Sequence, residues 1–405
     1  MITSTALRAP REILFGSGQR RSLGRVARRF GNRALVCTDA RLAGDPLLRE
    51  MVDDLRRAGL EVQIDAGVEP DVPRDSCVRA AGPAREFRPD LVIGIGGGSC
   101  LDYAKCVALL VTHGGSPEQY YGEFNVPGPV LPVIAMPTTA GTGSEATPVA
   151  VLSDPDKIMK VGISSPHLIP QVAICDPELT VTCPPGLTAV TGADALTHAI
   201  EAFMAVRREP SPDLALDRVF IGKTEMTDFL ALKAISLING GLERACRNGS
   251  DLEARTRVMM GALYAGLAFG TAGTAAAHAI QYPIGTLTHT AHGLGVACML
   301  PYVMAYNRSV YGAELAEVGR AMGLAGAGEA ELGERTIRHV ATLFRTIGIP
   351  VSLAELGLPR DRLEWVGTQA LTVDRLVKNN PRPLDAASMD RLLQAAYAGD
   401  LASVD

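Results

Sequence analysis

The feature that most constrains the fold is an apolar run that ends directly in glycines, PDLVIGIGGGS at residues 89–99, before a helical pattern at 101–113. A short apolar run bounded by glycine is typical of a strand buried on both faces. The loop between such a strand and a helix can leave free N–H groups for a phosphate, although a plain tight turn is the alternative. The candidate phosphate-binding residues are Gly96, Gly97, Gly98 and Ser99.

Other short apolar runs alternate with amphipathic helical patterns over the first part of the chain. This alternation predicts an α/β fold with a parallel sheet covered by helices on both faces. The glycine loop follows two earlier strands, whereas the usual dinucleotide fingerprint G-x-G-x-x-G follows the first strand. The predicted strands are at residues 33–39, 61–67, 89–99 and 132–139, and the predicted helices at 45–60 and 71–88, the latter interrupted at Gly82-Pro83.

From about residue 186 the strand patterns largely disappear and long helical patterns follow. The chain has 405 residues, and a length of this order favours two domains. Pro184-Pro185-Gly186 breaks the chain, so we expect an α/β domain over 1–185 and an all-helical domain over 186–405. The predicted helices are at 188–206, 227–247, 252–280, 291–307, 311–323, 330–347 and 386–398, the last capped by Asp385.

Charge and composition narrow the class of protein. A formal net charge of −5 argues against a nucleic-acid or anionic-membrane partner. No apolar run approaches the roughly 20 residues of a membrane helix, and the first residues lack a signal-peptide layout, so a soluble cytoplasmic protein is expected. The eight cysteines form no C-x-x-C pair, which predicts reduced, packed thiols.

A second loop of small residues, PTTAGTGSEATP at 137–148, also follows a predicted strand. Such a loop can wrap a pyrophosphate or a ribose, with an ordinary polar connection as the alternative. Two such loops at the ends of neighbouring strands favour a ligand site there. Asp39 ends another strand, where a carboxylate favours NAD over NADP, or else caps a helix. The hydroxyl groups of the second loop belong to Thr138, Thr139, Thr142 and Ser144.

A candidate metal site combines two segments of the helical region. In GADALTHAIEAF, at 192–203, Asp194 and His198 lie one helical turn apart. Further along, His278 is expected to end one helix and His292 to begin the next. One carboxylate and three imidazoles suit Fe²⁺, Zn²⁺, Mn²⁺ or Ni²⁺. Hydrogen-bonded core histidines are the alternative, but polar groups in such apolar helices need a partner, which a metal would provide.

Together these segments resemble the iron-containing (group III) alcohol dehydrogenase family. GGGSCLDYAK and PTTAGTGSEAT are similar to its two nucleotide loops, GADALTHAIEAF and HAIQYPIGTLTHTAHG to its metal signatures, and NNPRP to a C-terminal turn. The resemblance spans about residues 10–398. It implies a dehydroquinate synthase-like architecture: a Rossmann-like nucleotide domain, an all-helical metal-binding domain, and an active site between them.

The resemblance also implies roles for individual residues. Many members carry a histidine where this chain has Tyr282, so the proton relay is expected to use Tyr282 or His289. Glu201 is expected to support the site rather than to bind the metal. A segment at 206–229 is longer than the usual link. The implied metal ligands are Asp194, His198, His278 and His292, and the implied nucleotide contacts are Gly97, Gly98, Ser99, Asp102, Lys105, Thr138, Thr139, Thr142 and, near the nicotinamide, Lys160.

The expected activity is reversible oxidation of a small aliphatic or aromatic alcohol to an aldehyde or ketone with NAD(H). A divalent metal, Fe²⁺ by family or else Zn²⁺ or another, would polarise the substrate oxygen. Val149 and Phe269 are expected to shape the pocket, and a homo-oligomer of at least two subunits is expected. The alternatives are a hydroxyacid–oxoacid transhydrogenase with bound NAD, a dehydroquinate synthase-like lyase, and a non-catalytic metal or nucleotide sensor.

Overall fold

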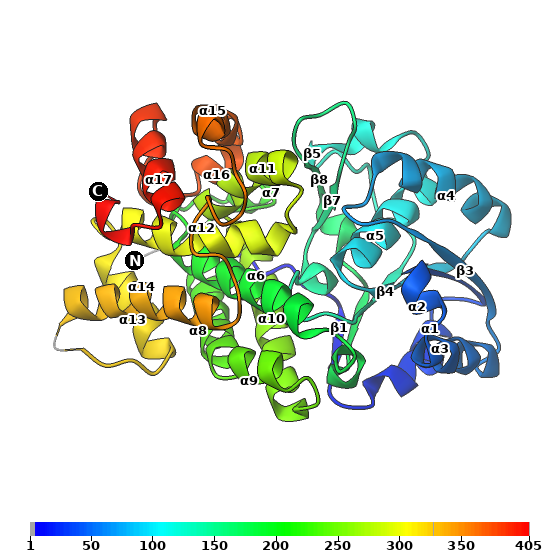
Figure 1. Ribbon diagram of the computed structural model, residues 1–405. Helices are drawn as coiled ribbons and strands as arrows, with labels where there is room; N and C mark the ends of the chain where they lie inside the picture. The colour runs from blue at the N-terminus through cyan, green and yellow to red at the C-terminus, as the bar shows by residue number, and fades with distance from the viewer. Residues whose placement is uncertain (1–4, 327, 405) are drawn as a thin grey trace. The chain divides into compact units, whose positions relative to one another are not determined.

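The computed structural model describes residues 5–326 and 328–404 (Figure 1). The chain divides into two compact units. The first, here called the α/β unit, comprises Arg8–Cys183 and Leu216–Val219. The second, here called the helical unit, includes Pro184–Ala215 and the chain from Phe220 onward.

The α/β unit is built on a six-stranded sheet in which every paired strand is parallel. Every residue of the central strand β4 is buried, as expected of a strand covered on both faces. This confirms the predicted parallel sheet. In spatial order the strands are β1 (Glu12–Phe15), β9 (Val172–Cys175), β6 (Val133–Pro137), β4 (Leu91–Gly96), β2 (Arg33–Asp39) and β3 (Glu61–Val68).

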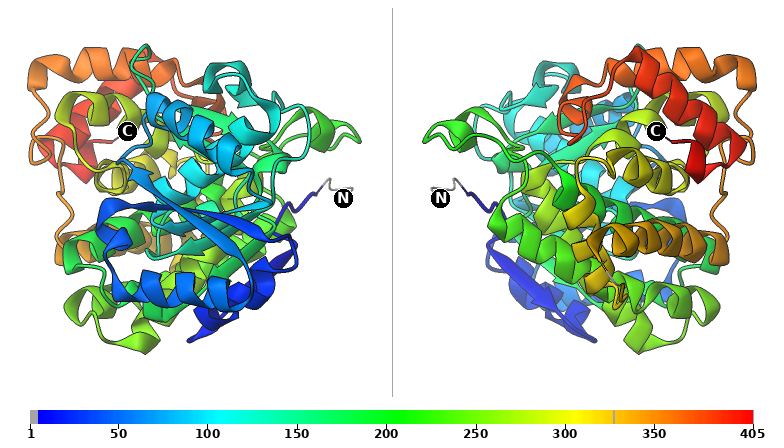
Figure 2. Two further views of the ribbon diagram at one scale, coloured as in Figure 1. Left: turned by 90° about the vertical axis from the view of Figure 1, so that its right-hand side faces the viewer. Right: turned by 90° about the vertical axis from the view of Figure 1, so that its left-hand side faces the viewer.

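Helices cover both faces of this sheet (Figures 1 and 2). On one face α1 (Leu23–Ala27) and α3 (Pro46–Arg57) form a core with alternate side chains of β2 and β4, such as Val36 and Ile93. On the other face α4 (Arg74–Phe87) and α5 (Gly98–His113) form a second core. The expected interruption of α4 at Gly82-Pro83 is wrong, because the helix continues through Pro83.

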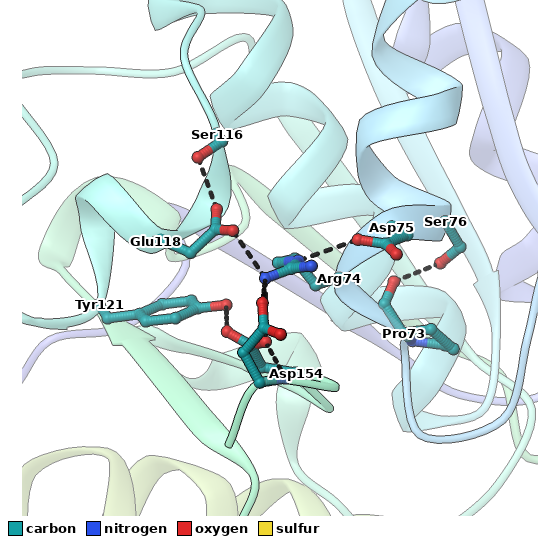
Figure 3. A network of polar contacts seen from close by, with 9 residues as sticks. Pro73, Arg74, Asp75, Ser76, Ser116, Glu118, Tyr121 and Asp154 are labelled. Carbon is teal, nitrogen blue, oxygen red and sulfur yellow. Dashed lines mark hydrogen bonds and ion pairs between the residues drawn. The ribbon is translucent and has the colours of Figure 1, made fainter.

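A second, three-stranded sheet has the order β5 (Gly122–Glu123), β8 (Val161–Ser164) and β7 (Val149–Leu152). Arg74, the first residue of α4, ties the end of this sheet to the rest of the unit (Figure 3). Its guanidinium contacts Asp75, Glu118 and Asp154, the last of which also accepts a hydrogen bond from Tyr121. The unit also contains α2 (Ala40–Ala43) and short 3₁₀ helices at Gln19–Ser22, Pro117–Tyr120, Ser144–Ala146, Pro166–Leu168 and Pro177–Thr180.

The helical unit packs around α6 (Pro185–Met204), which contacts α8, α9, α10 and α12. Most side chains of α6 are buried, because its sequence is apolar on almost every face. The other helices are α7 (Leu214–Asp217, at the border of the two units), α8 (Glu225–Asn239), α9 (Leu242–Arg247), α10 (Leu252–Ala272), α11 (Ala276–Thr288), α12 (His292–Asn307), α13 (Gly312–Ala321), α14 (Glu329–Thr346), α15 (Leu363–Leu371), α16 (Asp374–Val377) and α17 (Ala386–Ala398), with 3₁₀ turns at Arg360–Arg362 and Leu401–Ser403.

Two of the predicted helices are each divided in the structure. The pattern over 227–247 forms α8 and α9, which are separated at Gly240 and Gly241. The pattern over 252–280 ends at Gly273, whose φ of +81° a side chain would disfavour. His278 therefore lies in the new helix α11 and does not end the preceding one.

Two smaller predictions are confirmed. Asp385 caps α17 in a reciprocal arrangement with Ser388. All eight cysteines are thiols outside any disulfide of the described residues, and six of them are buried. In the described residues, no single helix has the length and apolarity to cross a membrane; the bent pair α10 and α11 passes that test only when taken together.

Candidate metal centre and nucleotide loops

Three helices of the helical unit bring a carboxylate and two imidazoles together. Asp194 lies in α6, His278 in the first turn of α11, and His292 at the first position of α12. One ligand atom from each lies within 4.8 Å of the others. Asp194 and His278 are buried, and His292 is partly buried. This is the only group of three or more potential ligands found among the described side chains.

His198, the fourth side chain that the sequence indicates, lies beside these three. It lies one turn after Asp194, and its Nε2 is 3.8 Å from Asp194 Oδ1. Its ring stacks on His278 with centroids 4.7 Å apart, and on Phe269 at 4.2 Å. Phe269, in α10, thus contacts the imidazole cluster directly.

The donor atoms fit a divalent cation. Two ligands that each bind an ion at about 2.0–2.2 Å lie roughly 3–4.5 Å apart, depending on the angle between them. His278 Nε2 is 3.8 Å from Asp194 Oδ1, within that range. This nitrogen is buried and has no hydrogen-bond partner in the part of the chain that the structure describes. A buried polar atom of this kind needs a partner, and a metal ion bound by these residues would supply one.

The far nitrogens of two imidazoles are held by other side chains. Glu201 Oε2 lies 2.6 Å from His278 Nδ1. The same carboxylate accepts hydrogen bonds from the backbone N–H groups of Ala275 and Ala277, at 2.9 and 2.7 Å. It therefore anchors the start of α11 and, with the proton on Nδ1, leaves His278 Nε2 as an electron-pair donor.

Gln281 plays the corresponding part for His292. Its Oε1 lies 2.7 Å from His292 Nδ1, and a proton on Nδ1 leaves the other ring nitrogen as an electron-pair donor. Gln281 is not among the site residues expected from the sequence. The sequence feature that points to Gln281 is its position three residues after His278, on the adjoining part of the same helix surface.

Of the two candidates for the proton relay, Tyr282 lies beside the cluster. Its ring stacks with that of His292 at a centroid distance of 6.0 Å. Burial raises the pKa of its phenol, so the group is protonated at neutral pH. His289 instead is exposed and ends α11 in a left-handed conformation with φ of +53°.

In the α/β unit, the two loops of small residues lie against each other at the carboxyl ends of β4 and β6. Thr138 N donates to Gly96 O at 2.9 Å. A Cβ atom at Gly98 would lie 2.5 Å from Thr142 Cγ2, so only glycine permits this approach. The chain passes from β2 to β3 on one side and then to β4 on the other, so the switch point at which open α/β sheets bind ligands lies between β2 and β4. The first loop borders this point, and the second loop follows the neighbouring strand β6.

The first loop presents the amino end of a long helix. Helix α5 begins at Gly98, and no side chain of the described residues caps its first N–H groups. Gly98 N and Ser99 N therefore remain available, with the positive end of the helix dipole behind them. This arrangement suits a phosphate.

Asp102 and Lys105 of α5 support the second loop from behind. Asp102 accepts hydrogen bonds from Ser144 Oγ at 2.5 Å and Val151 N at 3.0 Å, and burial raises its pKa. Lys105 is fully buried and donates to the carbonyl oxygens of Thr147 and Val149 at 3.1 and 2.8 Å. Both side chains are directed to protein groups, which corrects the expectation that Lys105 contacts the pyrophosphate.

Two further candidates are paired with protein groups. Asp39 Oδ1 accepts from Leu42 N at 2.8 Å and caps α2, and its Oδ2 lies 3.9 Å from Cys100 Sγ. The cap that the sequence left as an alternative is thus present at the end of β2. Lys160 forms an ion pair with Asp71, whose backbone φ is +63°.

The remaining candidates line the second loop and the strand that follows it. Thr138 and Ser144 are buried, and Thr139 lies beside the first loop, with its Oγ1 3.5 Å from the position of a Cβ on Gly97. Val149 is half-buried and begins β7.

Comparison with known proteins agrees with this description of the metal centre and the nucleotide loops. The family models "Iron-containing alcohol dehydrogenase" and "Fe-containing alcohol dehydrogenase family, C-terminal" match residues 10–177 and 188–397. Long-chain-alcohol dehydrogenase 1 of Geobacillus thermodenitrificans is 38% identical over 381 residues, which are 93% of this chain and 92% of that protein.

Two solved structures extend the agreement to the fold. A 1,3-propanediol oxidoreductase has a TM-score of 0.91 and 31% identity, covering 97% of this chain and 100% of its own. Sulfoacetaldehyde reductase from Bifidobacterium kashiwanohense, in complex with NAD+, has a TM-score of 0.84 and 25% identity, covering 99% and 100%. The family and the reaction class predicted from the sequence are confirmed: the chain belongs to the iron-containing alcohol dehydrogenase family, whose members named here are alcohol dehydrogenases and aldehyde reductases.

Proposed function

We propose that this chain interconverts a small alcohol and its aldehyde or ketone with NAD(H), using a divalent metal held by Asp194, His198, His278 and His292. The observation that carries the proposal is the buried cluster of imidazoles and one carboxylate, with two of the imidazoles oriented by Glu201 and Gln281. When bound, the metal supplies Lewis-acid polarisation of the substrate oxygen.

The residues around this cluster perform the remaining tasks. Glu201 keeps the Nδ1 proton of His278 in place and so fixes which nitrogen faces the cluster. Phe269 excludes water from the face of His198 on which it stacks. Tyr282, protonated at neutral pH and stacked on His292, holds the proton that is exchanged with the substrate oxygen.

The nucleotide is assigned to the loops after β4 and β6. Gly98 N and Ser99 N bind the pyrophosphate at the amino end of α5, and the hydroxyls of the second loop line the ribose. Asp39 retains one carboxylate oxygen that does not cap α2, and this oxygen accepts from a ribose hydroxyl and repels a 2′-phosphate. The preferred cofactor is therefore NAD(H), with Lys160 near its nicotinamide end.

The substrate is assigned to the class of small aliphatic or aromatic alcohols and aldehydes, because the candidate pocket residues Val149 and Phe269 are apolar. Eight cysteine thiols outside disulfides favour a reducing compartment, so we place the protein in the cytoplasm. By family, the protein is assigned as a homo-oligomer of at least two subunits, with a nucleotide domain over 1–185 and a metal domain over 186–405.

The test is metal analysis of protein purified anaerobically, followed by assays of an aldehyde panel with NADH and NADPH. We expect about one divalent ion per chain, reduction with NADH, and loss of activity on chelation that Fe²⁺ or Zn²⁺ restores. Turnover without added cofactor would instead favour a transhydrogenase with bound NAD. Metal binding without turnover of any alcohol or aldehyde would contradict the proposal.

A further inference from the structure

A hollow rich in arginine lies on the α/β unit, between α1 and α3. Its volume is about 510 Å³. We call it the arginine hollow, and its lining residues are Arg21, Arg25, Arg28, Arg29 and Arg57, with Asp54 and Ala58.

The packing of two helices fixes the positions of these arginines. Asp54 Oδ2 accepts a hydrogen bond from Gly24 N at 2.7 Å, which ties α1 to α3. Arg21 lies in the 3₁₀ helix before α1, Arg25 lies in α1 and Arg28 follows it, and all three line the hollow. Arg57, at the end of α3, adds a guanidinium from the opposite wall.

Protein carboxylates balance only part of this charge. Arg29 pairs with Glu12, and Arg57 lies 3.6 Å from Asp54. Arg21 lies 3.8 Å from Glu50, with 70% of its side chain exposed. Arg28 donates to Gly31 O at 3.1 Å and forms no ion pair with a carboxylate of the described residues. Arg25 makes no hydrogen bond or ion pair with any residue that the structure describes.

Arginines whose charge is not balanced by carboxylates repel one another. Like charges one helical turn apart destabilise a helix. The chain as a whole has a formal net charge of −5, so the local excess of positive charge is opposite in sign to that of the molecule. A bound anion would remove the repulsion within the group.

The arginine hollow is separate from the nucleotide loops. Helices α1 and α3 end at Ala27 and Arg57, shortly before β2 begins at Arg33 and β3 at Glu61. The hollow thus lies toward the amino ends of the parallel strands, whereas the glycine loops follow their carboxyl ends. These are opposite edges of the sheet.

We propose that the arginine hollow binds a small, multiply charged phosphate anion, either free tripolyphosphate or the triphosphate chain of a nucleotide. Guanidinium groups bind phosphate oxygens in pairs of parallel hydrogen bonds, and groups on two walls can contact successive phosphates. The open hollow would leave the organic part of a nucleotide outside, so the triphosphate chain is the recognised part.

The test is isothermal titration calorimetry of the full chain with tripolyphosphate and, separately, ATP, at 150 mM salt. Saturating NADH fills the nucleotide loops, and the metal content is measured before and after titration to exclude chelation. The test variant is R25Q/R28Q. The matched control is R335Q/R338Q, which removes the same charge from two exposed arginines one turn apart on α14.

We expect the wild type to bind tripolyphosphate, R25Q/R28Q to bind it at least tenfold more weakly, and R335Q/R338Q to bind it within twofold of the wild type. Equal affinity for ATP identifies the phosphate chain as sufficient; tighter binding of ATP identifies a nucleotide as the source. Absence of wild-type binding, or equal loss in both variants, would overturn the proposal. If R25Q/R28Q loses its far-ultraviolet circular dichroism, the single variant R57Q serves in its place.

Discussion

The metal centre and the nucleotide loops are built in opposite ways. At the metal centre the candidate ligands are side chains, and two of the imidazoles are oriented by another side chain, Glu201 or Gln281. At the nucleotide loops the candidate contacts are mainly backbone N–H groups and hydroxyls, and buried charges support the loops from behind. Single substitutions at the first region should therefore act on the ligand directly. At the second they should act mainly through the stability of the loops.

The largest effect is expected for His278→Ala. It removes a buried nitrogen that has no hydrogen-bond partner among the described residues and is proposed to bind the metal. The bound metal should fall from about one ion to under ~0.1 per chain, and alcohol oxidation by about 10³-fold or more. Metal analysis and steady-state rates measure both. His167→Ala, at an exposed histidine, should change neither; retained metal in the His278 variant would contradict the ligand assignment.

The second-largest effect is expected at Glu145, which lies in the second loop. Burial raises the pKa of Glu145 from 4.5 to about 7. The folded chain thus holds a proton over this range that the unfolded chain releases, so the stabilisation is present below pH 4.5 and is lost as the pH rises to about 7. Glu145→Gln should therefore gain stability relative to wild type between pH 5 and pH 8, by up to about 3 kcal/mol.

Urea denaturation at several pH values measures this difference. The exposed Glu86 offers a matched control, since Glu86→Gln should show no such dependence on pH. A difference between Glu145→Gln and wild type that stays constant from pH 5 to pH 8 would show that Glu145 is ionised in the fold. Buried charge at Glu145 would then no longer distinguish the nucleotide loops from the metal centre.

A smaller effect is expected for Glu201→Gln. With its oxygen in the place of Oε2, the amide can still accept from His278 Nδ1 and Ala275 N. Its NH₂ group, in the place of Oε1, cannot accept from Ala277 N. Metal affinity should fall about 10–100-fold, as is typical when the partner of a metal-binding histidine is altered. Competition with a chromogenic chelator gives the dissociation constant. An unchanged constant with lowered stability would reduce Glu201 to a structural role.

The smallest effect is expected for Asp39→Ala. Loss of one charged hydrogen bond to the ribose should lower kcat/KM for NAD about tenfold, and the ratio of NADP to NAD activity should rise. Because Asp39 also caps α2, Asp45→Ala is the matched control, since Asp45 caps α3. Equal losses with NAD in both variants would assign Asp39 to capping alone.

The sequence predicts the helices and strands of this fold well where the apolar pattern extends over many residues. The central strands of the sheet and helices such as α6 and α12 follow from apolar patterns. The strands β1, β7 and β9 were missed because four residues are too few to establish a pattern. The helix break at Gly273 was missed because an apolar pattern continues on both sides of it, and the left-handed backbone is a property of the tertiary fold.

The sequence predicts which residues form the candidate site, but not how their side chains are oriented. Asp194, His198, His278 and His292 are chemically conspicuous in apolar helices. The partnership of Glu201 with His278, however, depends on where α6 meets the start of α11, which the spacing of residues does not specify. In the same way, Lys105 has the chemistry of a phosphate contact, and only its burial beneath the second loop shows that it binds carbonyl oxygens instead.

The central claim is that one divalent ion is bound by one carboxylate and three imidazoles of the helical unit. A crystal structure of the anaerobically prepared, iron-loaded protein, with diffraction data at the iron absorption edge, tests this most directly. The account predicts one anomalous peak about 2 Å from Asp194, His198, His278 and His292. A peak elsewhere, or one that lacks any of these four ligands, would contradict it.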